Sequence, residues 1–165
     1  TELANRAHFD ARLTAELADP GGGARVALFF IDTDRFKAIN DELGHEAGDA
    51  VLATIARRLR SQVREGDLVA RIGGDEFAAL LTPLGDASQA SSIAAGMLDA
   101  MKEPVVLPAG KLLTVSFSIG IAFYPDHARD SAGLMKKADE AMYRSKRAGR
   151  GTYSVASIAA PPEES

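Results

Sequence analysis

The clearest structural pattern in the sequence is Asp67-Leu68-Val69-Ala70-Arg71-Ile72-Gly73-Gly74-Asp75-Glu76-Phe77-Ala78-Ala79-Leu80-Leu81. Its two mainly apolar halves, residues 67–72 and 77–81, are strand candidates separated by a turn that begins with two glycines. This pattern predicts a β-hairpin, because glycine supplies the positive φ that a tight turn needs. The two glycines would also let a ligand approach the backbone closely and leave Asp75 and Glu76 exposed at the tip.

Upstream of the hairpin, residues 26–31 form a continuous apolar run that ends in Asp32-Thr33-Asp34. Such a run predicts a strand buried on both faces, in the centre of a sheet that is covered by helices. Helical spacing on this side of the hairpin predicts three helices, at about residues 4–18, at Phe36–Leu43 and at about residues 49–63. Turn residues 19–23 would end the first of these helices.

Downstream of the hairpin we expect a loop at residues 82–85 and then a helix to about Met101, capped by Asp86 or Ser88. A short edge piece between Pro104 and residues 108–110 precedes a long strand at residues 112–123. A last helix at residues 132–148, stopped by Gly149, leads to a final strand at residues 152–158. The order β-α-β-β-α-β predicts a ferredoxin-like core.

The totals describe one globular domain. The chain has 165 residues, of which 46% are hydrophobic and 25% charged. A net charge of -4 gives no general attraction for nucleic acid, so we expect no nucleic-acid partner and local binding of any phosphate ligand. The chain has no cysteine, which excludes disulfides and thiolate metal sites and fits a reducing cytosol. No apolar run approaches the ~20 residues that span a bilayer.

The chain opens at Thr1 inside a segment with helical spacing, so we expect a piece of a longer, multidomain protein. We expect the domain to span residues 1–158 and residues 159–165 to be a disordered tail. A cytoplasmic location is expected for the domain, while the full-length protein could carry a membrane anchor or a sensor.

Two acidic spots are the first candidates for chemistry. Asp32 and Asp34 follow the buried strand, and Asp75 and Glu76 lie at the hairpin tip. If the two strands are neighbours, these carboxylates meet at one edge of the sheet, and their mutual repulsion then calls for a cation. Oxygen ligands favour Mg²⁺ or Ca²⁺, and a site with two carboxylates and open positions suits Mg²⁺ held together with a nucleoside triphosphate. The alternative is an ordinary turn and a polar hairpin tip.

Other polar residues are open to two interpretations. Asn40 and Asp49 could recognise the edge of guanine, or they could simply cap neighbouring helices. Lys37, Lys146 and Arg150 could hold phosphates, although the last two also suit the basic C-terminus of a helix.

The sequence resembles the GGDEF family of diguanylate cyclases across nearly its whole length, in five blocks that stand in the family's order. The blocks are residues 30–41, Gly44-His45 with Gly48-Asp49, residues 71–77, residues 118–122, and residues 138–143 with Lys146 and Gly149-Arg150. The resemblance implies an α/β (α+β sandwich) fold, with a ferredoxin-like, nucleotide-cyclase-like core and a mostly antiparallel sheet flanked by helices. Glu2 and Gly151 depart from the family's usual Gly and Asn, and both lie away from the expected metal site.

The resemblance also implies a role for each matching residue. Mg²⁺, or Mn²⁺ in its place, would be held by the carboxylates of Asp32 and Asp75, by the carbonyl of Thr33 and by Glu76. Asp75 and Glu76 would be catalytic, with Glu76 helping to deprotonate a ribose hydroxyl. GTP would be bound by a larger set of residues: Arg35, Phe36, Lys37, Asn40, Asp49, Gly74, Lys146 and Arg150.

The implied reaction condenses two GTP molecules into cyclic di-GMP, a bacterial second messenger, with release of pyrophosphate. Because one domain would hold one GTP, two domains must face each other as a homodimer. Arg64-Glu65-Gly66-Asp67 stands five residues before the Gly-Gly turn and resembles the family's inhibitory product site, in which Arg64 and Asp67 would bind cyclic di-GMP. The alternative at Arg64 and Asp67 is a surface turn with an ion pair.

The sequence is also compatible with other functions. The domain could bind GTP or cyclic di-GMP without turnover, although a defective turn or a missing Asp32 would be expected in that case. A nucleotide cyclase with another product, or a polymerase-palm-like domain, is a third interpretation. The Asn40 and Asp49 pair and the lack of a basic face argue against it. An upstream sensory or receiver domain is the expected partner in the full-length protein.

Overall fold

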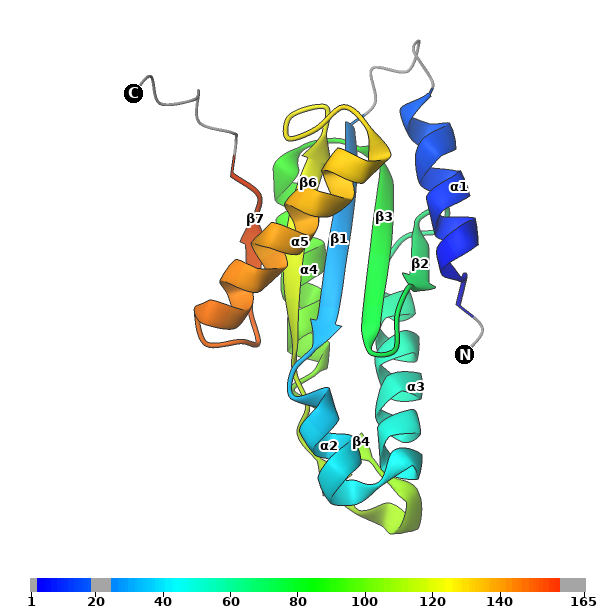
Figure 1. The fold of residues 1–165 in the computed structure, drawn as a ribbon, viewed down its shortest axis with the longest axis vertical. Helices are drawn as coiled ribbons and strands as arrows, with labels where there is room; N and C mark the ends of the chain where they lie inside the picture. The colour runs from blue at the N-terminus through cyan, green and yellow to red at the C-terminus, as the bar shows by residue number, and fades with distance from the viewer. Residues whose placement is uncertain (1–2, 19–24, 158–165) are drawn as a thin grey trace.

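The computed structural model describes residues 3–18 and 25–157, which form a central sheet with helices on both faces (Figure 1). The helices are α1 (Arg6–Leu17), α2 (Phe36–Leu43), α3 (His45–Gln62), α4 (Ala87–Ala100) and α5 (Ser131–Arg147), with a short 3-10 turn, η1, at Pro108–Gly110. The strands are β1 (Arg25–Thr33), β2 (Leu68–Arg71), β3 (Glu76–Leu84), β4 (Val105–Val106), β5 (Leu112–Leu113), β6 (Phe117–Tyr124) and β7 (Tyr153–Val155).

The main sheet has the strand order β2-β3-β1-β6-β7. Neighbouring strands are antiparallel except for β6 and β7, which are parallel. The predicted fold class, a mostly antiparallel sheet flanked by helices, is therefore confirmed. β1 lies in the middle of this sheet, so the end of β1 at Asp32 lies between Glu76 on β3 and Ser118 on β6.

Alternate residues of β1 enter two separate cores, as expected for a strand that is buried on both faces. Ala27, Phe29 and Ile31 belong to the core under α3 and α4. Val26, Leu28 and Phe30 belong to the core under α1 and α5. In Figure 1, α5 crosses in front of β6 and β1, and α1 lies at the right, next to β2. Both cores hold β1 in register, and this fixes the position of the acidic residues at its end.

Helix α5 packs unusually closely on β6. A β-carbon on Gly120 would lie 1.9 Å from the carbonyl oxygen of Ala138 and 2.3 Å from the amide nitrogen of Met142. Ser145 adds a buried hydrogen bond from its hydroxyl to the Ile119 carbonyl, 2.8 Å long. The last turn of α5 is therefore held against the sheet, next to the end of β1.

Several boundaries differ from the sequence predictions. The predicted loop at 82–85 is wrong, because β3 continues to Leu84, which is buried and pairs with Arg25 beyond an irregularity in the register. The predicted long strand at 112–123 is two strands, since Leu112 and Leu113 pair with β4 in a separate small sheet. Helix α3 begins at His45, four residues earlier than predicted, and β7 is shorter than predicted.

Other predictions are confirmed or lie outside the described residues. The hairpin of β2 and β3 and the boundaries of α2 are as predicted, and Asp86 caps α4. Gly149, at a φ of +117, follows α5 as its predicted stop. The expected turn at residues 19–23 and the expected tail at residues 159–165 lie outside the described part of the chain. Within that part, no helix combines the length and the apolarity that crossing a membrane requires.

Candidate active site

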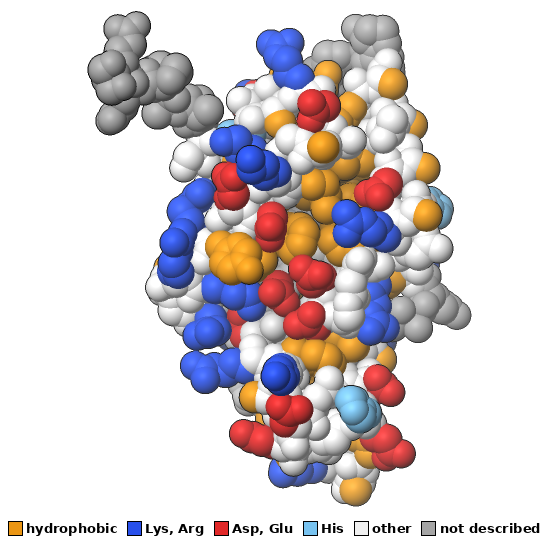
Figure 2. Space-filling view, viewed as in Figure 1, with side chains coloured by type: hydrophobic (Ala, Val, Ile, Leu, Met, Phe, Trp, Pro, Cys, Tyr) orange, Lys and Arg blue, Asp and Glu red, His pale blue; other side chains and the backbone are white. Residues whose placement is uncertain are grey.

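The end of β1 and the tip of the β2–β3 hairpin meet at one edge of the sheet. Asp32 pairs with Glu76 in the register of the two strands. Just beyond, the amide nitrogen and the hydroxyl of Thr33 both donate to the carbonyl oxygen of Asp75, each at 3.2 Å. The structure thus brings Asp32, Thr33, Asp75 and Glu76 together. Figure 2 shows acidic side chains gathered in the middle of this face, with Lys and Arg side chains on both sides of them.

The electrostatics of these carboxylates are those of a crowded, partly buried site. Burial, opposed by Lys146 and reinforced by the nearby Asp75, raises the pKa of Asp32 to about 7. The pKa of Glu76 is also raised, first by burial and then by Asp75 and Asp139. The Oδ1 atom of Asp32 is buried and has no hydrogen-bond partner among the described residues. A buried acceptor without a partner is costly, and a bound cation would satisfy it.

The residues present fit Mg²⁺ better than a metal that needs a complete protein cage. No group of three or more acidic or histidine side chains in the described chain is arranged as a ready-made metal site. Magnesium is usually held by one or two carboxylates, with substrate phosphates and water completing its shell. The partnerless Oδ1 of Asp32 beside Asp75 supplies that kind of incomplete site.

The Gly-Gly turn is held by hydrogen bonds from Arg71, and its outer side, at Gly74, is accessible. Arg71 donates from Nε to the carbonyl of Gly73 at 3.3 Å and from Nη2 to the carbonyl of Gly74 at 2.6 Å. A β-carbon on Gly73 would lie 2.4 Å from Oε1 of Glu76, so a larger residue there would displace the Glu76 side chain. A β-carbon on Gly74 would meet nothing within 4 Å, so that side of the turn is accessible to a ligand.

Basic groups lie on the other side of the carboxylates. Lys146, on the last turn of α5, places its Nζ 3.4 Å from Oδ2 of Asp32 and 3.2 Å from Oδ1 of Asp34. Arg150 is exposed in the turn that follows, and Lys37 is exposed on α2. Arg35 precedes α2 with a positive φ of 57, so the first amides of α2, at Phe36 and Lys37, open beside the end of β1. Such free amides are suited to binding an anion.

Asn40 and Asp49 lie where α2 meets α3. A β-carbon on Gly48 would lie 1.9 Å from Oδ1 of Asn40, so the Asn40 amide occupies space that only glycine leaves open. Asp49 follows Gly48 on α3 and is exposed. The two side chains therefore come from neighbouring positions at one helix junction. Neither of them is a cap residue, because Gly44 is both the C-cap of α2 and the N-cap of α3.

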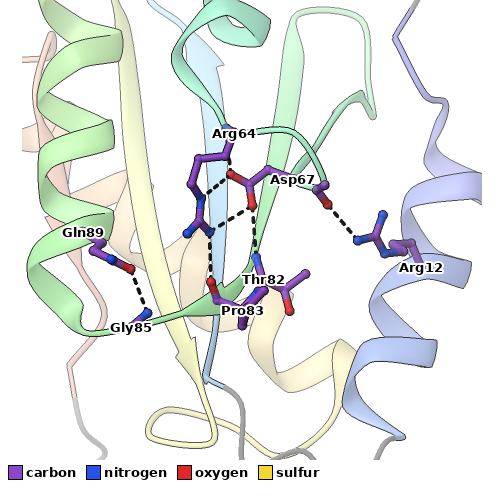
Figure 3. Close-up of polar contacts among 8 residues, drawn as sticks. Arg12, Arg64, Asp67, Thr82, Pro83, Gly85 and Gln89 are labelled. Carbon is purple, nitrogen blue, oxygen red and sulfur yellow. Dashed lines mark hydrogen bonds and ion pairs between the residues drawn. The ribbon is translucent and has the colours of Figure 1, made fainter.

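Arg64 and Asp67 form an ion pair just before the start of β2, at the end of the strand away from the Gly-Gly turn (Figure 3). The Asp67 carboxylate accepts from the backbone nitrogen, Nε and Nη2 of Arg64, and from the amide of Thr82. Arg64 Nη2 also donates to the Pro83 carbonyl at 3.0 Å. The Asp67 side chain is 1% exposed, whereas that of Arg64 is 43% exposed. The hydrogen bond from Arg12 to the Gly66 carbonyl links α1 to the same turn.

Comparisons with known proteins identify the family. The family model described as "Diguanylate cyclase, GGDEF domain" matches residues 1–152. The chain belongs to the GGDEF family. It is 49% identical over 162 residues to diguanylate cyclase TpbB of Pseudomonas aeruginosa, covering 98% of this chain and 37% of TpbB.

Solved GGDEF domains have the same architecture. The isolated GGDEF domain of TpbB is 50% identical to this GGDEF domain, with a TM-score of 0.93, over 96% of this chain and 92% of that one. The GGDEF domain of DgcB from Caulobacter crescentus, solved in complex with c-di-GMP, is 29% identical with a TM-score of 0.84, over 94% and 89% of the two chains. This chain spans little more than a third of the length of TpbB.

The GGDEF domain also holds features that the sequence did not reveal. Asp34 was expected to face a cation with Asp32, but its buried carboxylate turns into the protein and accepts from four donors. Arg71 supports the turn by its hydrogen bonds to the two glycine carbonyls; it lies in the family-matching block 71–77, but no role was predicted for it. Asp139 on α5 contributes to the raised pKa of Glu76 without belonging to the predicted set.

Proposed function

We propose that this GGDEF domain is a diguanylate cyclase that uses Mg²⁺. Two GTP molecules would react: the ribose 3′-oxygen of each attacks the α-phosphorus of the other, and each transfer releases one pyrophosphate. The product is cyclic di-GMP, with two new phosphodiester bonds in place of two phosphoanhydride bonds. The observation that carries the proposal is the meeting of Asp32, with its partnerless buried oxygen, and the Asp75-Glu76 turn at one sheet edge.

The metal site would consist of the carboxylates of Asp32 and Asp75, the carbonyl of Thr33 and, as a further ligand, Glu76. Mn²⁺ is a chemically similar substitute, because it accepts the same oxygen ligands. A bound divalent ion would offset the negative charge that develops on the phosphate oxygens during transfer.

The remaining groups bind and orient GTP. Lys146 and Arg150 would hold the phosphates together with Lys37 and the first amides of α2, next to Arg35 and Phe36. Gly74 would let the nucleotide lie against the turn. Glu76 is suited to accept the proton of the 3′-hydroxyl, because its raised pKa brings its basicity closer to neutral pH.

Guanine would be recognised at the junction of α2 and α3. The Asp49 carboxylate can accept from N1–H and the 2-amino group, and the Asn40 amide can donate to a ring or carbonyl acceptor. Adenine has no donor in those positions, so it would leave the Asp49 carboxylate without partners. We expect Asp49→Asn to raise KM for GTP about 10- to 100-fold while the melting temperature stays unchanged. Equal KM values for the variant and the wild type would contradict this assignment.

Catalysis would require two domains related by a two-fold axis, because one domain has one set of nucleotide-binding residues. An upstream sensory or receiver domain would control how often two domains meet. The "sensory box/GGDEF family protein" of Caulobacter crescentus, 39% identical with a TM-score of 0.84, is a solved relative whose description names such a segment. We propose that the domain acts in the cytoplasm.

Product inhibition would act through Arg64 and Asp67. Arg64 presents a partly exposed guanidinium that can bind phosphate or the Hoogsteen edge of guanine. Asp67 is buried and already accepts four hydrogen bonds, so the product would meet Arg64 first. Direct contact with Asp67 would require the pair to open.

Incubation of the domain with GTP and Mg²⁺ at several protein concentrations, followed by ion-exchange chromatography, tests the function. We expect cyclic di-GMP and pyrophosphate, at a rate per domain that rises with protein concentration because a dimer is needed. The Asp75→Asn variant is the control for contaminating activity. GTP that binds but is recovered unchanged at every concentration would instead make this a binding module without turnover.

A further inference from the structure

The Asp34 carboxylate joins three parts of the chain. It is buried, with a side chain only 4% exposed. Its Oδ2 accepts from the Ser116 hydroxyl at 2.6 Å and from the Gly151 amide at 3.0 Å. Its Oδ1 accepts from the Ser118 hydroxyl at 2.7 Å and from Lys146 Nζ at 3.2 Å. Asp34 thus links the end of β1 to the start of β6, to the last turn of α5 and to the turn beyond it.

That turn carries Arg150 in a backbone conformation that needs support. Gly149, Arg150 and Gly151 have φ values of 117, 66 and 62, three positive values in a row. Arg150 is not a glycine, and the left-handed region is unfavourable for an L-residue because its Cβ crowds the following carbonyl oxygen. Such conformations persist where surrounding contacts hold them. Here the contacts are the Arg150 amide on the Ser145 carbonyl, at 3.1 Å, and the Gly151 amide on Asp34.

We infer that Asp34 is a positioning residue that sets the phosphate-binding end of the site, through Lys146 on one oxygen and the Arg150 turn on the other. This inference rests on the proposed function, in which Lys146 and Arg150 bind the phosphates of GTP. Asp34 itself has no free acceptor for a metal or a nucleotide, since both of its oxygens already accept two hydrogen bonds each.

The chemistry of the four donors makes Asp34→Asn a selective change. An asparagine keeps one acceptor oxygen and replaces the other with an NH₂ donor. The serine hydroxyls can rotate and accept from that NH₂, but the Gly151 amide and the Lys146 ammonium can only donate. Because these two groups bind different oxygens of Asp34, an asparagine in its place cannot accept from both. Either the Gly151 amide loses its acceptor, or Lys146 keeps only the Asp32 carboxylate, at 3.4 Å, and shifts toward it.

The test compares binding of GTP with binding of guanosine, which has no phosphate, by NMR titration of the domain. The wild type is measured first, and tighter binding of GTP than of guanosine is the result that the proposed function requires. If the wild type bound GTP no more tightly than guanosine, the proposed function would be overturned, whatever the variants show. In Asp34→Asn we expect GTP affinity to fall on the order of tenfold, as for loss of one charge-assisted contact, while guanosine affinity changes less than about twofold.

Ser116→Ala is the matched control. It removes a hydroxyl partner of Asp34 but leaves the Lys146 and Gly151 contacts, so the ratio of the two affinities should stay at the wild-type value. The inference is overturned if Asp34→Asn leaves that ratio unchanged, or if Ser116→Ala lowers it as much. A double-mutant cycle of Asp34→Asn with Arg150→Ala should be non-additive, since Asp34 acts partly through Arg150.

Gly151→Val keeps the inference testable if Asp34→Asn does not fold. Gly151 is exposed, and a β-branched residue at a φ of 62 would force the turn away from Asp34 without altering β1. We expect the same selective loss of GTP affinity. Gly151→Asn, which tolerates positive φ and keeps the amide donor, should bind GTP as the wild type does. Unchanged GTP binding in Gly151→Val would overturn the inference.

Discussion

The two turns at the ends of β2 have opposite characters. The turn at Gly73–Glu76 leaves polar groups unused: Asp32 beside it has a buried oxygen without a partner among the described residues, and one side of Gly74 is open space. The turn at Arg64–Asp67 uses its polar groups within the protein, since the Asp67 side chain is 1% exposed and accepts four hydrogen bonds. The same strand thus connects an incomplete polar site to a complete one.

This difference is the one expected between a turn that binds a ligand and a turn that stabilises the fold. Groups that must act on a ligand cannot be satisfied beforehand by the protein, and the strain or raised pKa that results is characteristic of functional sites. Groups that are satisfied within the protein contribute to stability instead. The Arg64–Asp67 pair joins the start of β2 to Thr82 and Pro83 near the end of β3, so its first effect should be on folding.

The largest expected effect is on turnover at the Gly-Gly turn. Asp75→Ala and Glu76→Ala should each lower kcat about 10²- to 10⁴-fold, through loss of a metal ligand or of the proton acceptor. The melting temperature should change little, because neither side chain belongs to either apolar core. Glu65→Ala, an exposed acidic residue of the other turn, is the matched control. Full activity in either variant would refute the assigned site.

The next effect is on stability at the Arg64–Asp67 turn. Asp67→Asn should lower the free energy of unfolding by about 2–4 kcal/mol, because buried donors lose a charged acceptor. For a domain of this size that corresponds to a fall in melting temperature of roughly 4–16 °C. Asp75→Asn, measured in the same calorimeter, should show no such fall. Equal losses in the two variants would remove the distinction between the turns.

The sequence predicted the Gly-Gly turn better than the end of β3 that the Arg64–Asp67 pair contacts. Gly73 and Gly74 mark a hairpin by local chemistry alone, and the apolar run before Asp32 marks the central strand. Thr82 and Pro83 suggest a loop by the same local rules, but the burial of Leu84 and its pairing with Arg25 extend β3 through them. Burial and pairing depend on residues far away in the chain, so local patterns do not reveal them.

The same limit explains the error at Asp34. Asp32 and Asp34 look equivalent in the sequence, two acids at alternate positions after one strand. Their environments in the folded domain differ because the hydroxyls of Ser116 and Ser118, 82 and 84 residues further along the chain, donate to Asp34. A third donor, the Gly151 amide, comes from 117 residues away. The family resemblance placed Asp32 in the site, but no pattern near Asp34 indicated its buried partners.

A smaller effect is expected on product inhibition. Arg64→Ala should raise the cyclic di-GMP concentration that halves turnover about tenfold, through loss of a charge-assisted contact. Turnover before product accumulates should match the wild type, because the Gly-Gly turn is untouched. Arg12→Ala is the control: it breaks the hydrogen bond to the Gly66 carbonyl but keeps Arg64 in place. If added cyclic di-GMP inhibits Arg64→Ala and the wild type equally, the Arg64–Asp67 turn has a structural role and no role in inhibition.

The smallest effect is a pH dependence that comes from Asp32. Its pKa of about 7 in the folded domain exceeds the ordinary value of 3.8, chiefly because of burial. Between these two values the folded state binds more protons than the unfolded state, so this residue makes the metal-free domain less stable as pH rises from about 4 to about 7. Relative to Asp32→Asn, the wild type should therefore lose stability over that range.

Mg²⁺ should reverse the sign of this difference. Binding requires the carboxylate form, so added Mg²⁺ should stabilise the wild type increasingly from about pH 6 to about pH 8 and should leave Asp32→Asn nearly unchanged. Thermal unfolding with and without Mg²⁺ measures both effects, with Asp41→Asn on the exposed face of α2 as the control for lost surface charge. A Mg²⁺ response that is equal in the wild type and in Asp32→Asn would place the ion elsewhere, and the partnerless oxygen at the end of β1 would then need another ligand.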